Sequence, residues 1–555
     1  MNKTLKIFFV CSFLVIALAS LVAFSTNRAQ EDKPLFTENE YKAHLKFLAD
    51  DLLEGRAPGA HGGDLAALYI ASQFEAAGLK PITEENGYFQ QVPLIGMTTD
   101  YESLDFKLST GDESKTLKAI EDIVLYSELP QEDIHLEEEL IFVGYGVDAP
   151  EFGWDDFKDV DVTGKILLTL IGHPDYEQTG FGTESSPYYI QSEYKRAITR
   201  LKGAKGCIQI HADEISRFPF FSWQNITVSE CRSLENLSEK PLNIYGYISR
   251  PAIDAALSLV GLSFEQLKQK ADSRDFCPIP IDLKTEIHFK HNYRKIKSPN
   301  VIGILPGSST EEEAVIYMAH YDHLGIRRTV NGDNIYNGAM DNASGTAALI
   351  CLARAFASSS LTKRSIIFLA LTAEEDLMLG SWHYVLNPIL PLEKTIIGLN
   401  LDGLHFLGRE DGFGMFPVQY TNAVPTFQRI AKELGLKFHY GRVDRGGGAF
   451  RTDHYPFCTQ GVVALSISQD GSLLDYEWEE VKKLLEQVGE WYHKPTDEIY
   501  PFWRYEGIVQ IMTILHHAGR YYANDGERPS MNPENPFNAP KRIFEELYKD
   551  TNKKK

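Results

Sequence analysis

The chain has 555 residues, enough for two or more domains with sizeable cores. Its apolar fraction of 43% and charged fraction of 24% are those of an ordinary globular protein, which excludes disorder as the default state. Acidic residues outnumber Lys and Arg by 77 to 55, for a net charge of -22, and this balance argues against nucleic acid as the main partner.

The first residues have the pattern of a targeting segment. Two lysines in MNKTLK precede the apolar run IFFVCSFLVIALASLVAF, which ends in small residues and is followed by polar ones. This order is typical of a secretory signal, although the run is also nearly long enough to span a bilayer. We therefore predict that residues 1–29 direct export to the periplasm or the cell exterior, as a cleaved signal or as an uncleaved membrane anchor.

The next two segments differ in their hydrophobic patterns. Residues 36–104 begin with two helical patterns, YKAHLKFLADDLLEG and DLAALYIASQFEAAGLK, each with a glycine near its end. From about residue 105 short apolar runs such as ELIFVGYGV and GKILLTLIG alternate with Gly, Pro and Asp turns. We predict that residues 105–297 form a separate, strand-rich domain.

Strands and helices alternate over residues 298–530. The apolar runs AVIYMA, SIIFLALTA and TIIGLNL are each separated from the next by a helical pattern. Such alternation predicts an α/β fold, a mixed and mostly parallel sheet covered by helices on both faces. Residues 531–555 are read as a polar C-terminal tail.

Acidic residues and histidines follow the ends of these predicted strands. Ligands of open α/β sheets bind at the carboxyl ends of strands, so we expect the side chains to meet at one rim. Imidazoles and carboxylates without thiolates suit zinc or a similar divalent metal. The residues are His320, Asp322, Asp341, Glu374, Glu375, Asp402 and His454.

Each of these residues also has a plainer reading. Asp341 could cap a helix, and the pair Glu374 and Glu375 could be a solvated helix start favoured by the helix dipole. Taken together, however, these residues form five features at comparable places, with His320 and Asp322 as one and the glutamate pair as another, and this coincidence favours a metal site. Two metals bridged by a carboxylate can hold a hydroxide nucleophile, and a separate carboxylate must then carry the proton.

Five motifs in order resemble the dizinc exopeptidase family of bacterial leucine aminopeptidases, glutamate carboxypeptidase and transferrin receptor. They lie within residues 298–500 and read AHYDHLG, NGAMDNASG, TAEEDLMLGS, LNLDG and TDHYPF. LADDLLEGRAPGAHGG resembles the leading segment of that family, which assigns residues 36–104 to the peptidase domain. GYGVDAPEFGWDDF resembles the protease-associated domain inserted in many members, which identifies residues 105–297 as that insertion.

The resemblance implies a role for each site residue. Two Zn²⁺ per chain would be bound by His320, Asp341, Glu375, Asp402 and His454, with Asp341 as the bridge between them. Glu374 would act as general base and then as general acid. Asp322 would orient His320, because metal-bound imidazoles need such a partner.

Some positions depart from the family pattern. Leu377 and Gly403 stand where the family usually has glycine and methionine, and Met340 precedes the bridging position, where many relatives have aspartate. YHKPTD resembles a family element near the substrate, so His493 and Asp497 are candidate substrate contacts. We interpret His323 and His383 as packing or supporting residues.

These observations predict an exported dizinc aminopeptidase that acts on peptides. A carboxypeptidase, dipeptidase or glutaminyl cyclase on the same scaffold is an alternative. A non-enzymatic binding protein, as in the transferrin receptor branch, is a third, although that branch has lost ligands and no ligand of the pattern is missing here.

Overall fold

A computed structural model describes residues 34–548 except for short gaps at residues 175–180, 182–185, 215, 217–218, 221–222, 225–229, 236–240, 310–311, 442–443, 445–446 and 489–490. The predicted signal or anchor at residues 1–29 lies outside the described residues. Among the helices that are described, none combines the length and apolarity needed to cross a bilayer.

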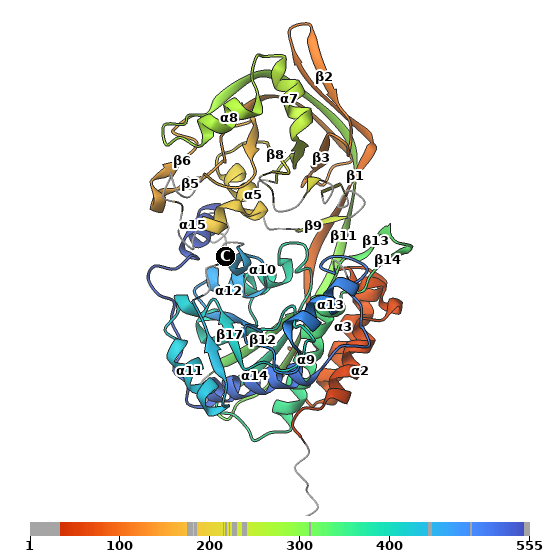
Figure 1. Ribbon diagram of the computed structural model, residues 1–555, viewed down its shortest axis with the longest axis vertical. Helices are drawn as coiled ribbons and strands as arrows, with labels where there is room; N and C mark the ends of the chain where they lie inside the picture. The colour runs from red at the N-terminus through yellow and green to blue at the C-terminus, as the bar shows by residue number, and fades with distance from the viewer. Residues whose placement is uncertain are drawn as a thin grey trace, which may run out of the picture.

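Two lobes share one long pair of strands, visible at the right of Figure 1. β1 (Phe89–Thr110) and β11 (Ile279–Leu305) run antiparallel, from the pair Phe89 and Val301 to the pair Ser109 and Lys284. Both strands continue from the lower lobe into the upper one. The predicted domain limits at residues 105 and 297 therefore fall inside continuous strands.

The lower lobe contains the α/β sheet expected for residues 298–530. Its strand order is β18-β17-β19-β16-β12-β15-β11, in which β19, β16, β12 and β15 are parallel. β11 is antiparallel to β15, and β17 is antiparallel to β19 but parallel to β18. The predicted mixed, mostly parallel sheet is confirmed. The bounds are β12 (Ala314–His320), β15 (Ser365–Leu371), β16 (Thr395–Asn400), β17 (Gly412–Phe416), β18 (Lys437–His439) and β19 (Ala464–Ser468).

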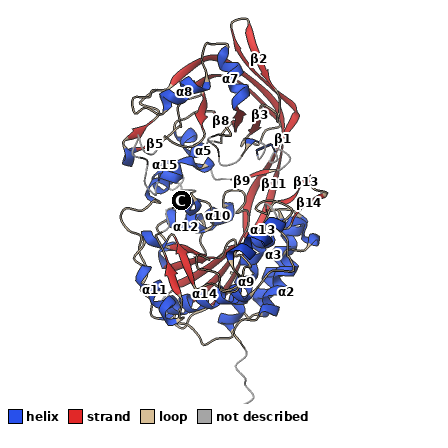
Figure 2. Cartoon of the chain, viewed as in Figure 1, coloured by secondary structure: helices blue, strands red, loops and turns tan. Residues whose placement is uncertain are grey.

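Helices cover both faces of this sheet (Figure 2). Successive side chains of β12 alternate between two cores, since Tyr317 belongs to one and Ile316 and Met318 to the other. This explains why the strand reads as an uninterrupted apolar run. One face packs on α2 (Glu38–Leu48), α3 (His61–Ala76), α9 (Ser344–Ala357), α11 (Val424–Glu433) and α14 (Glu506–Asn524), and the other on α10 (Leu379–Leu386) and α12 (His454–Thr459).

The upper lobe has its own parallel strands, β4, β7, β8 and β10, with β3 antiparallel at the edge. Their bounds are β3 (Ile123–Tyr126), β4 (Asp133–Phe142), β7 (Ile166–Leu170), β8 (Gly206–His211) and β10 (Ile244–Ser249), with α5 (Ser192–Leu201), α7 (Arg250–Ser258) and α8 (Phe264–Ala271). Two further strands, β2 (Glu113–Leu117) and β9 (Cys231–Leu234), pair with β1. The strand-rich part of the chain is thus a second α/β layer joined edge to edge with the first through β11.

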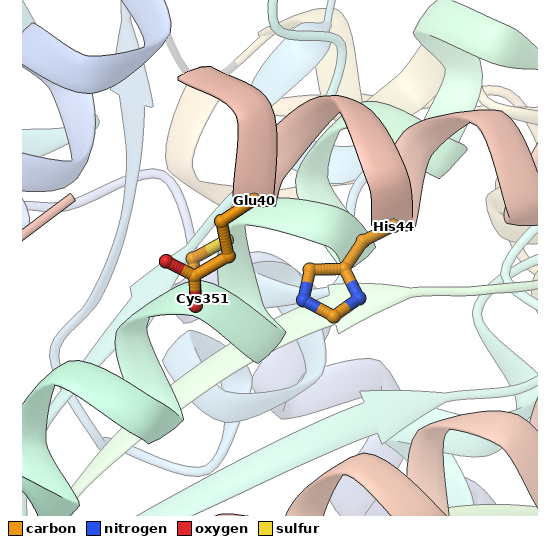
Figure 3. Close-up of side chains that lie close together, drawn as sticks. All are labelled: Glu40, His44 and Cys351. Atoms are coloured by element: carbon orange, nitrogen blue, oxygen red, sulfur yellow. The ribbon is translucent and has the colours of Figure 1, made fainter. Parts of the chain in front are cut away.

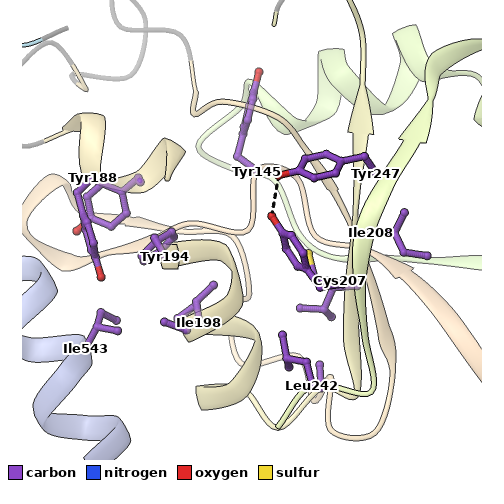
Figure 4. Packing of buried hydrophobic residues seen from close by; sticks show 14 of the residues in the cluster. Tyr145, Tyr188, Tyr194, Ile198, Cys207, Ile208, Leu242, Tyr247 and Ile543 are labelled. Atoms are coloured by element: carbon purple, nitrogen blue, oxygen red, sulfur yellow. Dashed lines mark hydrogen bonds between the residues drawn. The ribbon is translucent and has the colours of Figure 1, made fainter. Parts of the chain in front are cut away.

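The segment expected to be a polar tail contains a packed helix, α15 (Asn538–Tyr548). Ile543 is 2% exposed and lies beside Tyr188 and Ile198 of the upper lobe (Figure 4). Phe544 stacks on Trp382 of α10, with ring centroids 5.1 Å apart. The expectation of a tail was wrong because the few apolar residues of this segment share one helical face, and α15 joins the two lobes through them.

Candidate metal centre

Three neighbouring strands deliver most of the predicted site residues to one end of the sheet. His320 is the last residue of β12, Glu374 and Glu375 follow β15, and Asp402 follows β16. Asp341 comes from the irregular turn Ala339–Ala343 that precedes α9. Parallel neighbours end at the same edge, so these side chains approach one another, as the order of the motifs indicated.

A first group of donors surrounds His320. Its Nε2 atom lies 3.4 Å from Asp341 Oδ1, 3.4 Å from Asp402 Oδ1 and 3.8 Å from Glu374 Oε2. His320 is 1% exposed. The ligand atoms of His320, Glu374 and Asp402 all lie within 4.8 Å of one another, a separation that would admit one cation.

A second group surrounds Glu375. Its Oε2 atom lies 3.0 Å from His493 Nε2, and its Oε1 atom lies 2.6 Å from His323 Nδ1. His493 Nε2 is also 3.3 Å from Asp341 Oδ2. Asp341 therefore turns one carboxylate oxygen toward each group, which is the arrangement a bridging ligand needs.

Part of this spacing fits two tetrahedral cations, whereas the 2.6 Å contact of Glu375 with His323 is too short for two ligands of one ion. Donors that lie 2.0–2.2 Å from a common zinc ion are about 3.3–3.6 Å from one another, and the contacts of His320 and His493 with Asp341 are 3.4 and 3.3 Å. His323 Nε2 is buried without a hydrogen-bond partner, while His323 Nδ1 lies against Glu375 Oε1.

The structure does not bring His454 into either group. His454 begins α12, its Nδ1 is 2.5 Å from the hydroxyl of Thr452, and its ring packs edge-on against Phe416. Burial lowers the pKa of His454 to about 3. His493 occupies the place beside Glu375 and Asp341 that the sequence analysis gave to His454, and this is a correction of that prediction.

Asp322 supports the site differently from the expected way. Its carboxylate accepts hydrogen bonds from the backbone N–H groups of Glu374, at 3.1 Å, and Glu375, at 3.4 Å. The ring nitrogen Nδ1 of His320 is closer to the backbone oxygen of Asp322, at 3.3 Å, than to its carboxylate, at 3.8 Å. Asp322 thus fixes the backbone that carries both glutamates, in addition to facing His320.

The segment YHKPTD joins the site at two points. His493 lies in the second donor group, and Asp497 accepts hydrogen bonds from the backbone N–H groups of Met340 and Asp341 at 2.8 and 3.0 Å. Asp497 is 2% exposed. Both were expected to contact substrate; the structure instead places them where they hold the candidate bridge. The signal for His493 was the motif itself, a histidine four residues before an aspartate.

Burial and charge shift the proton affinities in the centre. Burial lowers the pKa of His493, but the carboxylates of Glu375 and Asp341 outweigh it and raise the value to about 10. Burial raises the pKa of Glu374 well above its usual range, against the opposing charge of His320. Burial also raises the pKa of Asp453, beside this group, to about 7. A buried carboxyl with a raised pKa can exchange protons near neutral pH.

A third cluster of donor atoms lies apart from the sheet edge, between α2 and α9 (Figure 3). It consists of Glu40, His44 and Cys351. Both oxygens of Glu40 accept hydrogen bonds from Arg354, at 2.6 and 2.9 Å, and His44 Nδ1 is 2.9 Å from the Tyr69 hydroxyl. The guanidinium already neutralises the carboxylate and would repel a cation, so we assign no metal there.

A parallel sheet edge with two donor groups joined by one aspartate defines a metallohydrolase centre on an α/β fold. Residues 300–514 match the model of peptidase family M28. This match covers the part of the chain that carries both donor groups, and it supports a metallo-exopeptidase.

The chain is similar to solved structures. An aminopeptidase from Aneurinibacillus sp. strain AM-1 matches with a TM-score of 0.52 at 18% identity, covering 90% of this chain and 97% of that one. BSAP, a zinc aminopeptidase from Bacillus subtilis, matches with a TM-score of 0.46 at 20% identity, covering 90% and 99%. The first of these likenesses confirms the α/β aminopeptidase fold. No curated protein matches the chain.

Proposed function

We propose that the protein is an exported dizinc aminopeptidase that removes N-terminal residues from peptides. The observation that carries the proposal is the position of Asp341, whose two oxygens face His320 and His493 at 3.4 and 3.3 Å. This is the arrangement that a carboxylate bridging two cations would have. The residues that would hold the ions are His320, Asp341, Asp402, Glu375 and His493.

The bound ions would polarise the scissile carbonyl and make a water molecule acidic enough to attack near neutral pH. The protein's own part is proton transfer. Glu374 lies 3.8 Å from His320, is buried, and has a raised pKa. It would accept the proton of the attacking water and return it to the leaving amine, while Asp322 keeps its backbone in place.

Charge around the centre favours the amino end of a peptide. Buried carboxyl groups outside the two donor groups, Asp322 and Asp453, would attract an α-ammonium group when ionised. Arg232, which the inserted segment contributes through β9, is already paired with Asp376 at 2.9 Å and with Glu230 at 3.2 Å. The titles of structures with this fold, which include aminopeptidases, point in the same direction.

A carboxypeptidase or dipeptidase is the second candidate. Arg327, on the β13 strand (Gly325–Val330), lies close enough to Glu375 and Asp376 for their charges to raise its pKa against the larger lowering by burial. An arginine beside the centre could bind the terminal carboxylate of a peptide. A carboxypeptidase would need a free carboxyl end, where an aminopeptidase needs a free amino end.

The experiment compares three versions of one tripeptide: unmodified, N-acetylated and C-amidated. The aminopeptidase proposal predicts that zinc-loaded protein cleaves the unmodified and C-amidated peptides and leaves the N-acetylated one intact. Cleavage that survives N-acetylation and is lost on C-amidation would replace the proposal with the carboxypeptidase.

Export and domain organisation belong to the same proposal. The charged and apolar pattern of residues 1–29 supports export, with cleavage or anchoring as alternatives. We infer that residues 105–297 are an inserted protease-associated domain, supported by the motif GYGVDAPEFGWDDF and by the position of Arg232 at the centre. Mass spectrometry of the protein recovered from the medium and from the membrane of an expressing culture distinguishes a cleaved signal from an uncleaved anchor.

A further inference from the structure

The turn that carries Glu374 and Glu375 has an unusual backbone. Ala373, Leu377 and Met378 have φ values of +54°, +69° and +58°. Residues other than glycine rarely adopt this left-handed region, and a turn that contains three of them persists only where surrounding contacts offset the cost. Leu377 also stands where the sequence analysis expected glycine. The conformation that aims both glutamates therefore depends on contacts from outside the turn.

The lower lobe supplies one of these contacts. The carboxylate of Asp322 accepts hydrogen bonds from the backbone N–H groups of Glu374 and Glu375, at 3.1 and 3.4 Å. The backbone N–H group of Met378 then donates to the backbone oxygen of Glu374 at 2.8 Å and closes the turn. Asp376 lies between these bonded residues, and its side chain is held from the other lobe.

The upper lobe contacts the turn through Arg232 of β9. The Nη1 atom of Arg232 donates a hydrogen bond to Oδ2 of Asp376 at 2.9 Å. The two side chains are only 10% and 13% exposed. Removing one partner from a pair so shielded leaves an uncompensated charge, so the pair matters more than an exposed one would. The segment between β1 and β11 thus makes a charged contact with the residue next to Glu375.

The strands around Arg232 are arranged to hold its guanidinium group. β1 pairs with β9 and with β11, so Arg232, Gly96 and Arg294 lie side by side. Glu230 crosses over Gly96 and contacts Arg294 at 2.6 Å and Arg232 at 3.2 Å. A Cβ atom at Gly96 would stand 2.3 Å from Oε1 of Glu230, so glycine makes this crossing possible. One nitrogen of Arg232 is therefore fixed by Glu230 while another reaches Asp376.

We propose that Arg232 is a positioning residue, whose ion pair with Asp376 keeps the turn in the conformation that aims Glu374 at the attacking water. The inference rests on the proposed function and extends it, because it gives the segment between β1 and β11 a part in the reaction. A displacement of about 1 Å can slow catalysis about 10²-fold. Since Glu374 acts in the chemical step, loss of the pair should lower kcat much more than it changes KM.

The test measures kcat, KM and the hydrogen exchange of residues 372–378 in the full chain, with zinc buffered at a level that saturates each variant. Arg232→Met should lower kcat about 10- to 100-fold and speed exchange in the turn. Asp376→Asn removes the same pair by an isosteric change and should have both effects. Lys295→Met is the matched control, because Lys295 is on the same ribbon of strands but pairs with Glu235 and is 76% exposed. It should change neither quantity.

The double variant with Arg232→Met and Asp376→Asn separates positioning from a general contribution to stability. If Arg232 acts through Asp376, the double variant should be no slower than the slower single variant. Effects on kcat that multiply would overturn the proposal, as would wild-type kcat and exchange in Arg232→Met. If the wild type cleaves no peptide, the aminopeptidase function is refuted, and faster or unchanged exchange of residues 372–378 in Arg232→Met still decides whether Arg232 holds the turn.

Discussion

Glu374 and Glu375 are adjacent in the chain but face different donor groups. Glu374 lies by His320, and Glu375 lies between His323 and His493. The backbone N–H groups of both glutamates donate hydrogen bonds to the carboxylate of Asp322, and these bonds fix the backbone from which the two side chains point apart. One residue can therefore bind metal while its neighbour carries a proton.

Substitutions of His493 and His454 should have opposite effects on the number of zinc ions bound. We expect His493→Ala to lose one of the two zinc ions, because the imidazole lies against both Glu375 and Asp341. His454→Gln should retain both ions, since His454 lies in neither donor group. Zinc per chain after dialysis against buffered metal measures the difference. One zinc in His454→Gln and two in His493→Ala would restore the original assignment.

The sequence could predict most of the centre because four of its residues follow apolar strands. AVIYMAH, SIIFLAL and TIIGLN each end beside an acid or a histidine, and parallel strands end at one edge. The assignment of His454 instead of His493 as a ligand was wrong, since neither histidine directly follows a strand and only His493 lies in a donor group. The segment between them contains α13 (Trp478–Val488), and no periodicity indicates where the chain returns to the sheet.

His516 should make stability depend on pH. Its ring packs between Phe356 and Phe36, its Nε2 is buried without a partner, and burial lowers its pKa from 6.5 to about 4. The unfolded chain therefore binds more protons between pH 6.5 and about 4, and the contribution of His516 to stability is lost as pH falls through this window.

Replacement by phenylalanine should remove this loss. We expect His516→Phe to gain roughly 1–3 kcal/mol over the wild type as pH falls from 7 to 4.5, measured as the difference in unfolding free energy in urea. His517→Phe, at an exposed histidine next to it, is the control and should show no such trend. A constant difference between His516→Phe and wild type would contradict the assigned pKa.

Arg56 links several elements around the centre. Its guanidinium donates to the backbone oxygens of Leu48, Tyr321, Asn337 and Gly338, and it is 1% exposed. It therefore ties the end of α2 to the segment after β12 and to the turn that carries Asp341. Burial lowers its pKa to about 10, against the opposing charge of Asp497.

A lysine ammonium group cannot reproduce the planar set of N–H donors with which the Arg56 guanidinium binds these four backbone oxygens. We expect Arg56→Lys to lower the free energy of unfolding by about 2–4 kcal/mol and to weaken zinc binding, because both donor groups depend on the clamped segments. Arg429→Lys, about half exposed on α11, is the matched control. Chemical denaturation and zinc competition are the measurements, and unchanged values in Arg56→Lys would refute the clamp.

Elements at the lobe boundary were the least predictable from sequence. The predicted domain boundaries at residues 105 and 297 follow changes in the hydrophobic pattern of the sequence. In the structure, however, β1 and β11 run through both lobes without a break. α15 was missed because few residues of the last segment pack against the rest of the chain, among them Phe537, Ala539, Ile543, Phe544 and Leu547. Their helical spacing becomes meaningful only once α5 and α10 supply a surface.

At the scale of the whole molecule, α15 fastens the upper lobe to the lower one. We expect Ile543→Ala to cost about 2–4 kcal/mol and to speed hydrogen exchange in α5, which α15 contacts. Glu545→Ala, on the exposed face of the same helix, should change neither quantity. Slow exchange in α5 of Ile543→Ala would show that the lobes are held by β1 and β11 alone.

The central claim is that Glu374 moves the proton in a centre whose metals are held by other residues. The most direct test is Glu374→Gln, with zinc per chain and peptide turnover measured on the same preparation. We expect two zinc ions per chain and a kcat reduced by about 10²- to 10⁴-fold. Near-normal turnover, or loss of zinc in proportion to activity, would contradict it.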